Sequence, residues 1–581
     1  MNWSGNAPCL LRHRKGSVMP PIMVYEQNKA YIIQQFHNGH FDYIDVVQEV
    51  AQRDFFRFVA STPLLERLAE SYPWPRKKEE VPRWFYIAAD MAMRLHGNHA
   101  FQGFPWVVST GGLLSAFGPK LGTKHIDAAG RLRIACPGFN TKNDYPRQTP
   151  CDQDFLRKIA KDTPAAELMR WFNGAVQQIF RRQRFFDKAG IFIGDGSYIF
   201  VPDNERYEGS VKMFFDEHNH PVSESRRKTM APAELQRCQW HRCYKMVSLL
   251  HTNENGDFFL YAGMRLVPGN VHEGPVLWEM VDEFIASMGK GVIKDLILDR
   301  GFLDGAAIAK AKTQHLIDVT IGVKRNMNVL EDALGLVNFP GVQWERYTRQ
   351  PSEPPVPFTR HYNDAPRPEH LEKRESARQQ TLNEQRAADE RPPLKAPEPI
   401  LATRIKALTT WDSCSVPLDL VLCRDARDDT LADAWGLLST ACHEEQAIPV
   451  LKRYHIRVLI EERHRQLKCF WDLAEFTSPC FALVVNQIIF TALTYSLLQQ
   501  QILRQARKAL NKASKRRMIE ELVPVSDHVV VYTDHYYAFF HNLEYTGMVL
   551  DVPEAARQKL RNLIKLKQSQ TRLSLAMDGP P

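Results

Sequence analysis

The chain has few of the features that mark secreted or membrane proteins. Its ten cysteines are scattered through 581 residues and lack the regular spacing of a disulfide framework. The first 16 residues, MNWSGNAPCLLRHRKG, contain no continuous apolar stretch of the signal-peptide kind. We therefore expect reduced thiols in a cytoplasmic protein. No internal repeat is visible either.

Long apolar runs are equally scarce. Residues 480–498, CFALVVNQIIFTALTYSLL, are about long enough to span a bilayer, and no second such stretch exists. Asn486 and Gln487 lie at its centre. These polar amides favour a helix buried in a protein core over a membrane span, so we expect no membrane partner.

Charge of one sign is only in mild excess. The net charge is +8 and the isoelectric point is about 8.8. This balance is compatible with a polyanionic partner and equally with a slightly basic protein that has none. Hydrophobic residues make up 44% and charged residues 24%, which is ordinary globular composition. At roughly 150 residues per domain, the length predicts about four structural units.

The expected secondary structure changes character along the chain. Residues 1–186 are predicted to form a mainly helical domain, with apolar residues at helical spacing in 45–72, 84–95 and 164–186. From residue 190 the β-branched and aromatic content rises. Strands are expected at 191–201, 245–251, 257–267, 292–299 and 316–323, and helices at 274–288 and 303–314.

The order of these elements predicts a fold class. Three antiparallel strands, the second and third joined by a hairpin turn at Asn253–Gly256, are followed by two α/β crossovers. Such an order produces a mixed sheet covered by helices. It is the element order of a ribonuclease H-like fold, an α/β core whose first part is expected at 187–325.

The second half of the chain is predicted to interrupt and then complete this core. An insertion is expected at 326–449, and within it residues 351–399 hold ten of the 36 prolines, as in a surface excursion or a disordered segment. Helical spacing returns at 450–470 and 478–505, so 450–505 is expected to complete the core. The remaining 506–581 should be mainly helical, with a strand-like run at 528–532 and a last helix opened by Asp551 and Pro553.

Two aspartates follow apolar strand-like runs. Asp195 comes after IFIG, and Asp299 ends LIL. A carboxylate at such a place must be solvated, paired or bound to a cation, because burial of a lone charge is costly. Taken singly, each is also compatible with an ordinary strand-end aspartate. Asp295 shares a strand face with Asp299 but is expected inside the strand, so we rank it second as a ligand.

One predicted helix, 454–468, places chemistry-bearing residues on a single stripe. Successive residues turn by about 100° on a helix, so the spacings of 3, 4 and 7 align Tyr454, Arg457, Glu461 and Lys468. The other side is apolar except for Arg463, for which the pattern offers no explanation. Glu462 points about a quarter-turn away, which favours Glu461 as the functional acid. A solvated polar face is the simpler alternative.

Together these carboxylates suggest a metal site. Asp195, Asp299 and Glu461, from two strands and one helix, can hold two divalent cations, because hard cations such as Mg²⁺ prefer oxygen ligands. In two-metal sites the ions lie roughly 4 Å apart, one activating the attacking oxygen and the other stabilising the leaving oxygen. The neighbouring tyrosine, arginine and lysine are suited to hold phosphates.

These motifs resemble those of a known enzyme family. The spacing of Tyr, two residues, Arg, three residues, Glu, six residues and Lys is the YREK signature of DDE transposases of bacterial insertion sequences, and Tyr454, Arg457, Glu461 and Lys468 fit every interval. GDGSYIFV resembles the strand of the family's first aspartate. LILDRGFLDG resembles its second-aspartate segment. The family also carries a β-rich insertion where this chain has 326–449.

The resemblance implies a function and a set of roles. Asp195, Asp299 and Glu461 would be the catalytic metal ligands, holding two Mg²⁺ ions with Mn²⁺ as a substitute. The enzyme would nick the ends of an insertion element and join the 3′ ends to target DNA.

It also implies partners. Tyr454, Arg457 and Lys468 would contact the DNA backbone near the cleaved end. The helical domain 1–186 would bind DNA, and the protein would act as a homodimer or larger assembly on paired ends, at the nucleoid of a bacterial cytoplasm.

Two alternatives remain open from the sequence. A non-catalytic relative would bind the element's DNA and regulate it, and a structure-specific nuclease on the same fold would cut without joining. The intact carboxylate trio argues against the non-catalytic regulator, because DNA binding alone does not require acids beside phosphates. The YREK spacing argues against the nuclease.

Several weaker signals accompany these motifs. The spacing of Cys238, His241 and Cys243 matches no common zinc pattern. His272 is compatible with a place beside the site or with an ordinary loop. The basic segment 504–517 is compatible with phosphate contacts or with a solvated helix face. The insertion contains three tryptophans that either stack on a flipped base, as in some family members, or belong to the core: Trp344, Trp411 and Trp435.

Overall fold

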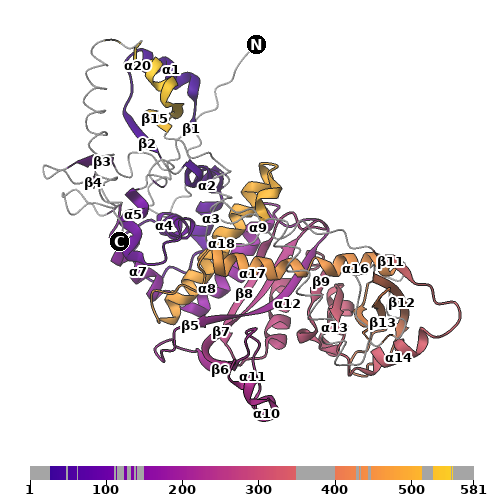
Figure 1. Ribbon diagram of the computed structural model, residues 1–581. Coiled ribbons are helices and arrows are strands. Elements are labelled where there is room, and N and C mark those ends of the chain that lie inside the picture. The colour runs from indigo at the N-terminus through magenta and orange to yellow at the C-terminus, as the bar shows by residue number, and fades with distance from the viewer. Residues whose placement is uncertain are drawn as a thin grey trace, which may run out of the picture. The chain divides into compact units, whose positions relative to one another are not determined.

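The computed structural model consists of two compact units. It describes residues 26–47, 50–61, 63–109, 123–126, 132–135, 150–347, 400–426, 433–441, 446–512, 528–534 and 536–550, with a few single positions between them. The first unit comprises Met1–Trp171, Trp471–Gln501 and Arg516–Pro581, and the second comprises Phe172–Phe470 and Ile502–Lys515. Figure 1 labels the elements of both.

The second unit is built on one large mixed sheet (Figure 1). Nine strands follow the order β11-β12-β13-β14-β10-β9-β5-β7-β6, and β8 pairs with β7 as the tenth. β5 is antiparallel to β7 and parallel to β9, β9 is parallel to β10, and β10 is antiparallel to β14. The strands are β5 (Ile191–Val201), β6 (Val211–Phe215), β7 (Gln239–Thr252), β8 (Leu260–Pro268), β9 (Asp295–Leu298), β10 (Asp318–Gly322), β11 (Glu345–Tyr347), β12 (Ile400–Leu408), β13 (Leu418–Asp425) and β14 (Trp435–Ser439). This mixed sheet is consistent with the predicted ribonuclease H-like core.

Helices follow the strands in the predicted order. The long crossover helix is α12 (Glu273–Met288), and the second crossover holds α13 (Gly305–Lys310) and the π-helical turn η4 (Ala311–His315). The other helical elements are η2 (Phe172–Val176), α9 (Gln177–Arg182), α10 (Glu224–Thr229), α11 (Pro232–Leu235), η3 (Arg300–Phe302), α14 (Asn328–Leu336), α16 (Ala447–His455), α17 (Val458–Phe470) and η5 (Lys508–Lys512). Apolar residues of α12, α13 and α14 form one core cluster with β5, β7, β9 and β10.

The sequence pattern missed the excursion between β5 and the middle of β7. β6, α10 and α11 had no predicted counterpart, and β7 begins six residues before the expected start at 245. The first four residues of β7, Gln239–Arg242, are exposed or half-buried and pair only with β5 and β6 near the sheet edge. Such a segment has no apolar run or alternation, so it escapes a search based on hydrophobic period.

The strands of the predicted insertion extend the core sheet. β14 joins β10 through Thr320↔Ser439, and β13, β12 and β11 continue outward from it. The insertion therefore shares its hydrogen-bonded ladder with the core, while its boundaries at 326 and 449 stay a prediction. The proline-rich segment 351–399 lies outside the described residues.

The first unit contains the long apolar helix predicted from residues 480–498. In the described part of the chain, α18 (Phe481–Arg504) is the one helix long and apolar enough to cross a membrane, and 83% of its most apolar window is buried. The central amides find partners inside the unit: Asn486 donates to Asp90 at 2.7 Å, and Gln487 donates to the carbonyl of Leu473 at 3.3 Å. These hydrogen bonds satisfy the two side-chain amides, as burial of a polar group in a core requires.

The N-terminal region is less helical than predicted. The expected helix at 45–72 is instead strand β2 (Tyr43–Val47), helix α2 (Val50–Ser61) and helix α3 (Leu64–Ser71). β2 belongs to a four-stranded sheet of order β1-β16-β15-β2. Its partners come from the far end of the chain, with Tyr43 opposite Tyr532. A partner almost 500 residues away leaves no local trace in the pattern around β2.

The remaining elements of the first unit are mainly helical. The expected helix at 84–95 is α4, whereas 164–186 is divided among α8 of this unit and η2 and α9 of the second unit. The run 528–532 is a strand, as predicted, and the helix expected after Asp551 lies outside the described residues. The elements not yet bounded are β1 (Glu26–Gln27), α1 (Lys29–His37), α4 (Arg83–His96), η1 (Phe101–Gly103), α5 (Phe104–Ser109), β3 (Thr123–Ile126), β4 (Leu132–Ala135), α7 (Gln153–Asp162), α8 (Ala165–Trp171), β15 (His528–Thr533), β16 (Tyr536–His541) and α20 (Asn542–Leu550).

A buried histidine on β7 should make stability depend on pH. The backbone N–H of Asp187 donates to Nε2 of His251 at 2.7 Å, so Nδ1 carries the proton and donates to the carbonyl of Ile191 at 2.9 Å. Burial lowers the pKa of His251 from 6.5 to about 4. The unfolded chain therefore binds the proton more readily, and the free energy of unfolding falls by about 3 kcal/mol as the pH drops from 6.5 to 4.

Denaturant unfolding at a series of pH values measures this effect. The wild-type protein should lose stability steadily across that window and keep it above pH 6.5. His251→Gln, which cannot titrate, should show a correspondingly flatter profile. The same slope in both proteins would show that other groups control the acid sensitivity.

Candidate active site

The pairing of β5 with β9 brings two of the predicted acids together. The register runs from Ile191↔Asp295 to Gly194↔Leu298, and Asp195 and Asp299 each follow that last pair by one residue. The two aspartates are therefore at the same level on neighbouring parallel strands, which lie about 4.8 Å apart. Their side chains are 16% and 41% exposed, so both carboxylates reach solvent.

The alternation of side chains along β5 decides which face they occupy. A Cβ on Gly194 would collide with Leu277 of α12, so glycine is needed where that helix packs. Successive residues of a strand point to opposite faces. Asp195 therefore points away from α12, toward the face covered by α16 and α17, and so does Ser197.

Asp295, the second-ranked candidate, lies elsewhere. It is the first residue of β9, not an interior one as predicted, and it is opposite Ile191 at the other end of the strand pair. Nη1 of Arg453 on α16 lies 3.3 Å from its carboxylate. The ion pair accounts for this aspartate without a metal.

The YREK residues do not share one helix: Tyr454 lies in α16, Arg457 in the turn that follows, and Glu461 and Lys468 in α17. A turn at Ile456 and Arg457 separates α16 from α17. The N–H of Arg457 bonds to the carbonyl of Tyr454 at 3.0 Å, three residues back, and Ile460 bonds to Arg457 at 2.9 Å in the same way. These i→i−3 bonds tighten the chain where a single helix was predicted, yet they keep the helical direction.

Tyr454 and Arg457 gather around Asp299. Nη2 of Arg457 lies 3.9 Å from Oδ1 of Asp299, and its guanidinium lies 5.7 Å from the ring centre of Tyr454. A Cβ on Gly322 would lie 3.2 Å from the tyrosine hydroxyl, so the glycine leaves room for it. Burial raises the pKa of Tyr454, while Arg457 lowers it and Asp299 raises it. The hydroxyl therefore remains a hydrogen-bond donor at neutral pH.

Lys468 reaches the same face from the last turn of α17. Its Nζ donates to the hydroxyl of Ser197 at 2.7 Å, two residues beyond Asp195 on β5. Glu461 lies in α17 between Arg457 and Lys468. Its side chain is outside the described part of the structure, so its role stays a prediction.

The structure shows contacts of two residues of α17 that the sequence pattern did not predict. Arg463, the exception on the apolar side, is 2% exposed and donates to the carbonyl of Asn511 at 2.6 Å. His464 was not singled out, although it follows Glu461 by one helical turn. Its Nε2 lies 3.4 Å from Oδ2 of Asp195. The i, i+3 spacing was the available signal.

The weaker candidates have structural roles in the described residues. His272 caps α12 by accepting the N–H of Gly274 at 3.1 Å. Burial raises the pKa of Cys243 to about 11, which disfavours the thiolate that zinc requires. Lys508, in the basic segment, pairs with Asp257 at 3.2 Å. Residues 513–517 lie outside the described residues.

The tryptophans of the insertion are partly accounted for. Trp344 lies under the guanidinium of Arg424 at 4.9 Å, and Trp411 packs against the core. Trp435 is 38% exposed. Exposure therefore distinguishes Trp435 from Trp344 and Trp411, which are half-buried.

The donor set fits a divalent cation but is incomplete among the described side chains. They contain no group of three His, Cys, Asp or Glu close enough to hold a metal ion, and Glu461 is not among them. Two carboxylates on adjacent strands are the hard oxygen ligands that Mg²⁺ prefers. A third from α17 would complete the set.

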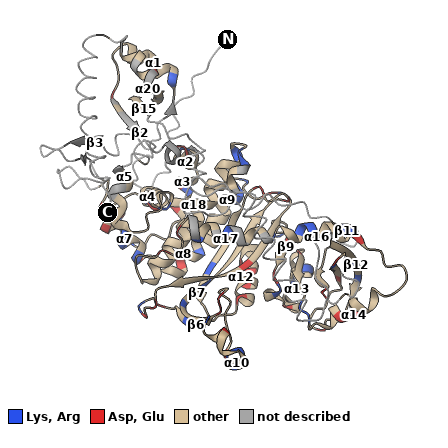
Figure 2. Ribbon diagram, in the orientation of Figure 1, with Lys and Arg blue, Asp and Glu red and all other residues tan. Residues whose placement is uncertain are grey.

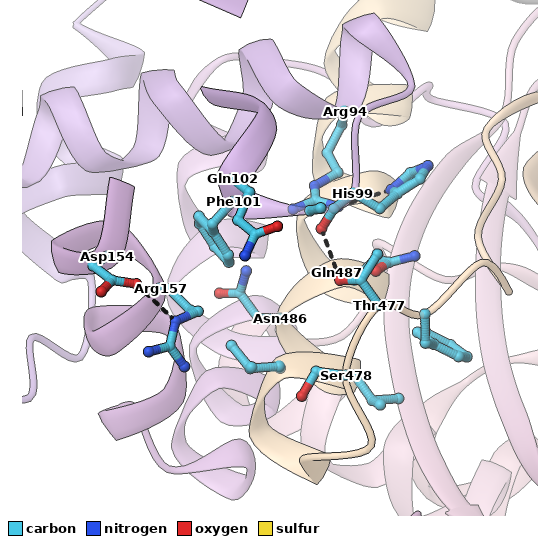
Figure 3. A pocket seen from close by; sticks show the side chains of 14 residues that line it. Arg94, His99, Phe101, Gln102, Asp154, Arg157, Thr477, Ser478, Asn486 and Gln487 are labelled. Carbon is cyan, nitrogen blue, oxygen red and sulfur yellow. Dashed lines mark hydrogen bonds and ion pairs between the residues drawn. The ribbon is translucent and has the colours of Figure 1, made fainter. Parts of the chain in front are cut away.

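A separate cavity of about 350 Å³ lies within the first unit (Figure 3). Its lining includes Arg94, His99 and Asn486. Nε of Arg94 donates to Asp90 at 2.8 Å, and its Nη1 lies 2.8 Å from Nδ1 of His99. These polar groups bind one another and join α4 to α18, so we assign them a structural role.

A comparison with protein families supports a transposase domain. Residues 210–497 match the model described as the transposase DDE domain. The matched stretch includes Asp299 and Glu461 and begins 15 residues after Asp195. No curated protein matches the chain. The matched stretch is a little under half of the chain, and it supports a DDE transposase.

Proposed function

We propose that the protein is a DNA transposase of the YREK group that nicks the ends of an insertion element and joins their 3′ ends to target DNA. The observation that carries this proposal is the β5–β9 register, which aligns Asp195 with Asp299 on the face covered by α16 and α17. Glu461 of α17 would complete the catalytic trio. The match to a transposase DDE domain supports the reaction class.

The residues around the acids have separable tasks in this proposal. Bound divalent cations, Mg²⁺ or Mn²⁺, would supply an activated attacking oxygen and a stabilised leaving oxygen. The Tyr454 hydroxyl and the Arg457 guanidinium are donors suited to a phosphate beside Asp299. Lys468 provides a further positive charge beside Ser197, on the Asp195 side.

The charges of the two helical layers favour DNA on the α16–α17 face. Residues 447–470 contain six Lys or Arg and two acids, whereas α12 contains four acids and neither Lys nor Arg. Figure 2 shows basic residues on α16 and acidic residues on α12. A phosphate backbone is attracted to the basic α16–α17 segment, whereas each of the four acids of α12 is already paired with a Lys or Arg.

Further elements of the proposal rest on the family resemblance. The DNA partners are the element's ends and a target duplex, and the ends are held by a homodimer or larger assembly. The element would be a bacterial insertion sequence, and the protein would then act at the nucleoid. The N-terminal region contributes DNA binding.

A strand-transfer assay tests the function. Purified protein is incubated with labelled DNA that carries the element's ends, a target plasmid and Mg²⁺. Nicked ends and labelled plasmid are the expected products. Nicking without joining would indicate a nuclease instead. Binding without cleavage under Mg²⁺ or Mn²⁺ would indicate a non-catalytic regulator.

Lys468 should contribute a phosphate contact. Lys468→Gln is expected to weaken binding to all DNA sequences about equally and to reduce the slope of log affinity against log salt by about one. The matched control is Lys310→Gln, because Lys310 pairs with Asp282 of α12 on the other face. Filter binding across a salt series measures both. An unchanged slope for Lys468→Gln would remove this lysine from the interface.

A further inference from the structure

We propose that His464 is a positioning residue for Asp195, the first acid of the catalytic site. The inference rests on the proposed function, since it assumes that Asp195 binds a divalent cation. His464 itself touches neither the DNA nor the metal in this proposal. Its task is to hold the aspartate carboxylate in one orientation.

The geometry around the imidazole defines this task. His464 is 4% exposed. Its Nε2 lies 3.4 Å from Oδ2 of Asp195 and 3.3 Å from the hydroxyl of Ser248, and its Nδ1 lies 3.4 Å from the hydroxyl of Tyr261. Asp195 and Ser248 are direct partners across β5 and β7. One side chain of α17 therefore contacts three adjacent strands, β5, β7 and β8.

One assignment of protons satisfies all of these contacts. The hydroxyl of Ser248 donates to the carbonyl of Asp195 at 3.4 Å, so its oxygen accepts from Nε2 of His464. Nε2 then carries the proton and also faces the Asp195 carboxylate. Nδ1, without a proton, accepts from the hydroxyl of Tyr261. The hydrogen bonds therefore run in one direction, from the Tyr261 hydroxyl to His464, from His464 to Ser248 and from Ser248 to the backbone of β5.

The consequence concerns the two oxygens of the carboxylate. The contact of Nε2 with Oδ2 restricts rotation of the Asp195 side chain, which leaves Oδ1 as the oxygen available to a cation. Ligating carboxylates are commonly held by polar partners of this kind, and loss of the partner typically weakens metal affinity about 10- to 100-fold. Because His464 lies one turn beyond Glu461, the same contact anchors the helix that carries the third acid.

Two amide variants separate positioning from simple packing. Glutamine places its side-chain N–H near the position of Nε2, whereas asparagine is too short to reach Asp195. We expect His464→Gln to bind Mn²⁺ within about threefold of the wild-type affinity and His464→Asn to bind about 10- to 100-fold more weakly. The free Mn²⁺ signal in electron paramagnetic resonance, with DNA ends present, gives both affinities without any turnover.

The controls keep the outcomes distinct. Equal Mn²⁺ affinity for the two variants, at either level, would overturn the proposal. If His464→Asn does not fold, Tyr261→Phe replaces it, and unchanged Mn²⁺ affinity in that variant would overturn the proposal equally. Asp195→Asn tests the underlying function: Mn²⁺ binding and cleavage that survive this change would refute the catalytic site itself, whatever His464 does.

Discussion

Glu461→Gln is expected to abolish end cleavage and joining together, while binding to the element's ends stays within about threefold. Metal-ion catalysis contributes several kcal/mol of transition-state stabilisation, and about 4 kcal/mol corresponds to a loss on the order of 10³-fold in rate. Glutamine keeps the size of the side chain but removes the charge that a divalent cation needs. A single-turnover assay on labelled ends, with a plasmid target, measures both steps.

Glu462→Gln is the matched control, because the two acids are neighbours on α17 and both substitutions change the net charge of the protein by the same amount. About a quarter-turn of helix separates them, so only one can share the stripe of Arg457 and Lys468. Glu462→Gln should therefore retain both steps. An inactive Glu462→Gln beside an active Glu461→Gln would keep the transposase proposal and refute the choice of acid.

Asp90→Ala is expected to lower the free energy of unfolding of the first unit by about 3–5 kcal/mol, because it removes the carboxylate partner of the buried Arg94. Asp90 and Arg94 are each 1% exposed, and Nε of Arg94 donates to Asp90 at 2.8 Å. Asn486 of α18 donates to the same carboxylate at 2.7 Å and accepts from the hydroxyl of Tyr86 at 3.0 Å. The substitution therefore removes the acceptor that joins α4 to α18.

The exposed pair Arg157–Asp154 is the control for this effect. Nε of Arg157 lies 3.2 Å from Asp154, but the side chains are 42% and 61% exposed. Surface pairs contribute about 0–1 kcal/mol, so Asp154→Ala should leave the urea midpoint almost unchanged. Chemical denaturation of the full chain, followed by circular dichroism, compares the two. A shift of similar size in both variants would show that the buried pair contributes no more to stability than the exposed pair.

Much of the large mixed sheet could be predicted because its signals are local. The apolar runs before Asp195 and Asp299, the turn at Asn253–Gly256 and the helical spacing of 274–288 each depend on a few neighbouring residues. β5, β9 and α12 accordingly lie where the pattern placed them, to within a few residues. The spacing likewise predicted a common direction for Tyr454, Arg457 and Lys468, which do face β5 and Asp299, although a turn divides their helix; the direction of Glu461 stays a prediction.

Other features depend on partners that are distant in sequence. β2 forms because β15 is available beside it, and that strand comes almost 500 residues later. Arg463 breaks the apolar side of α17 because the carbonyl of Asn511 accepts its N–H. Neither contact alters the hydrophobic period near its own residue, so neither could be seen from the pattern alone.

The sequence by itself determined the chain order of β5, β7, β8, α12, β9 and β10 and the residue types suited to metal and phosphate, since periodicity and spacing are properties of short segments. The tertiary structure decided which of those residues meet. Only the parallel pairing of β5 with β9 aligns Asp195 with Asp299, and only the packing of α17 on β5, β7 and β8 places His464 against Asp195. Register and packing arise from contacts between distant segments, and a local pattern does not encode them.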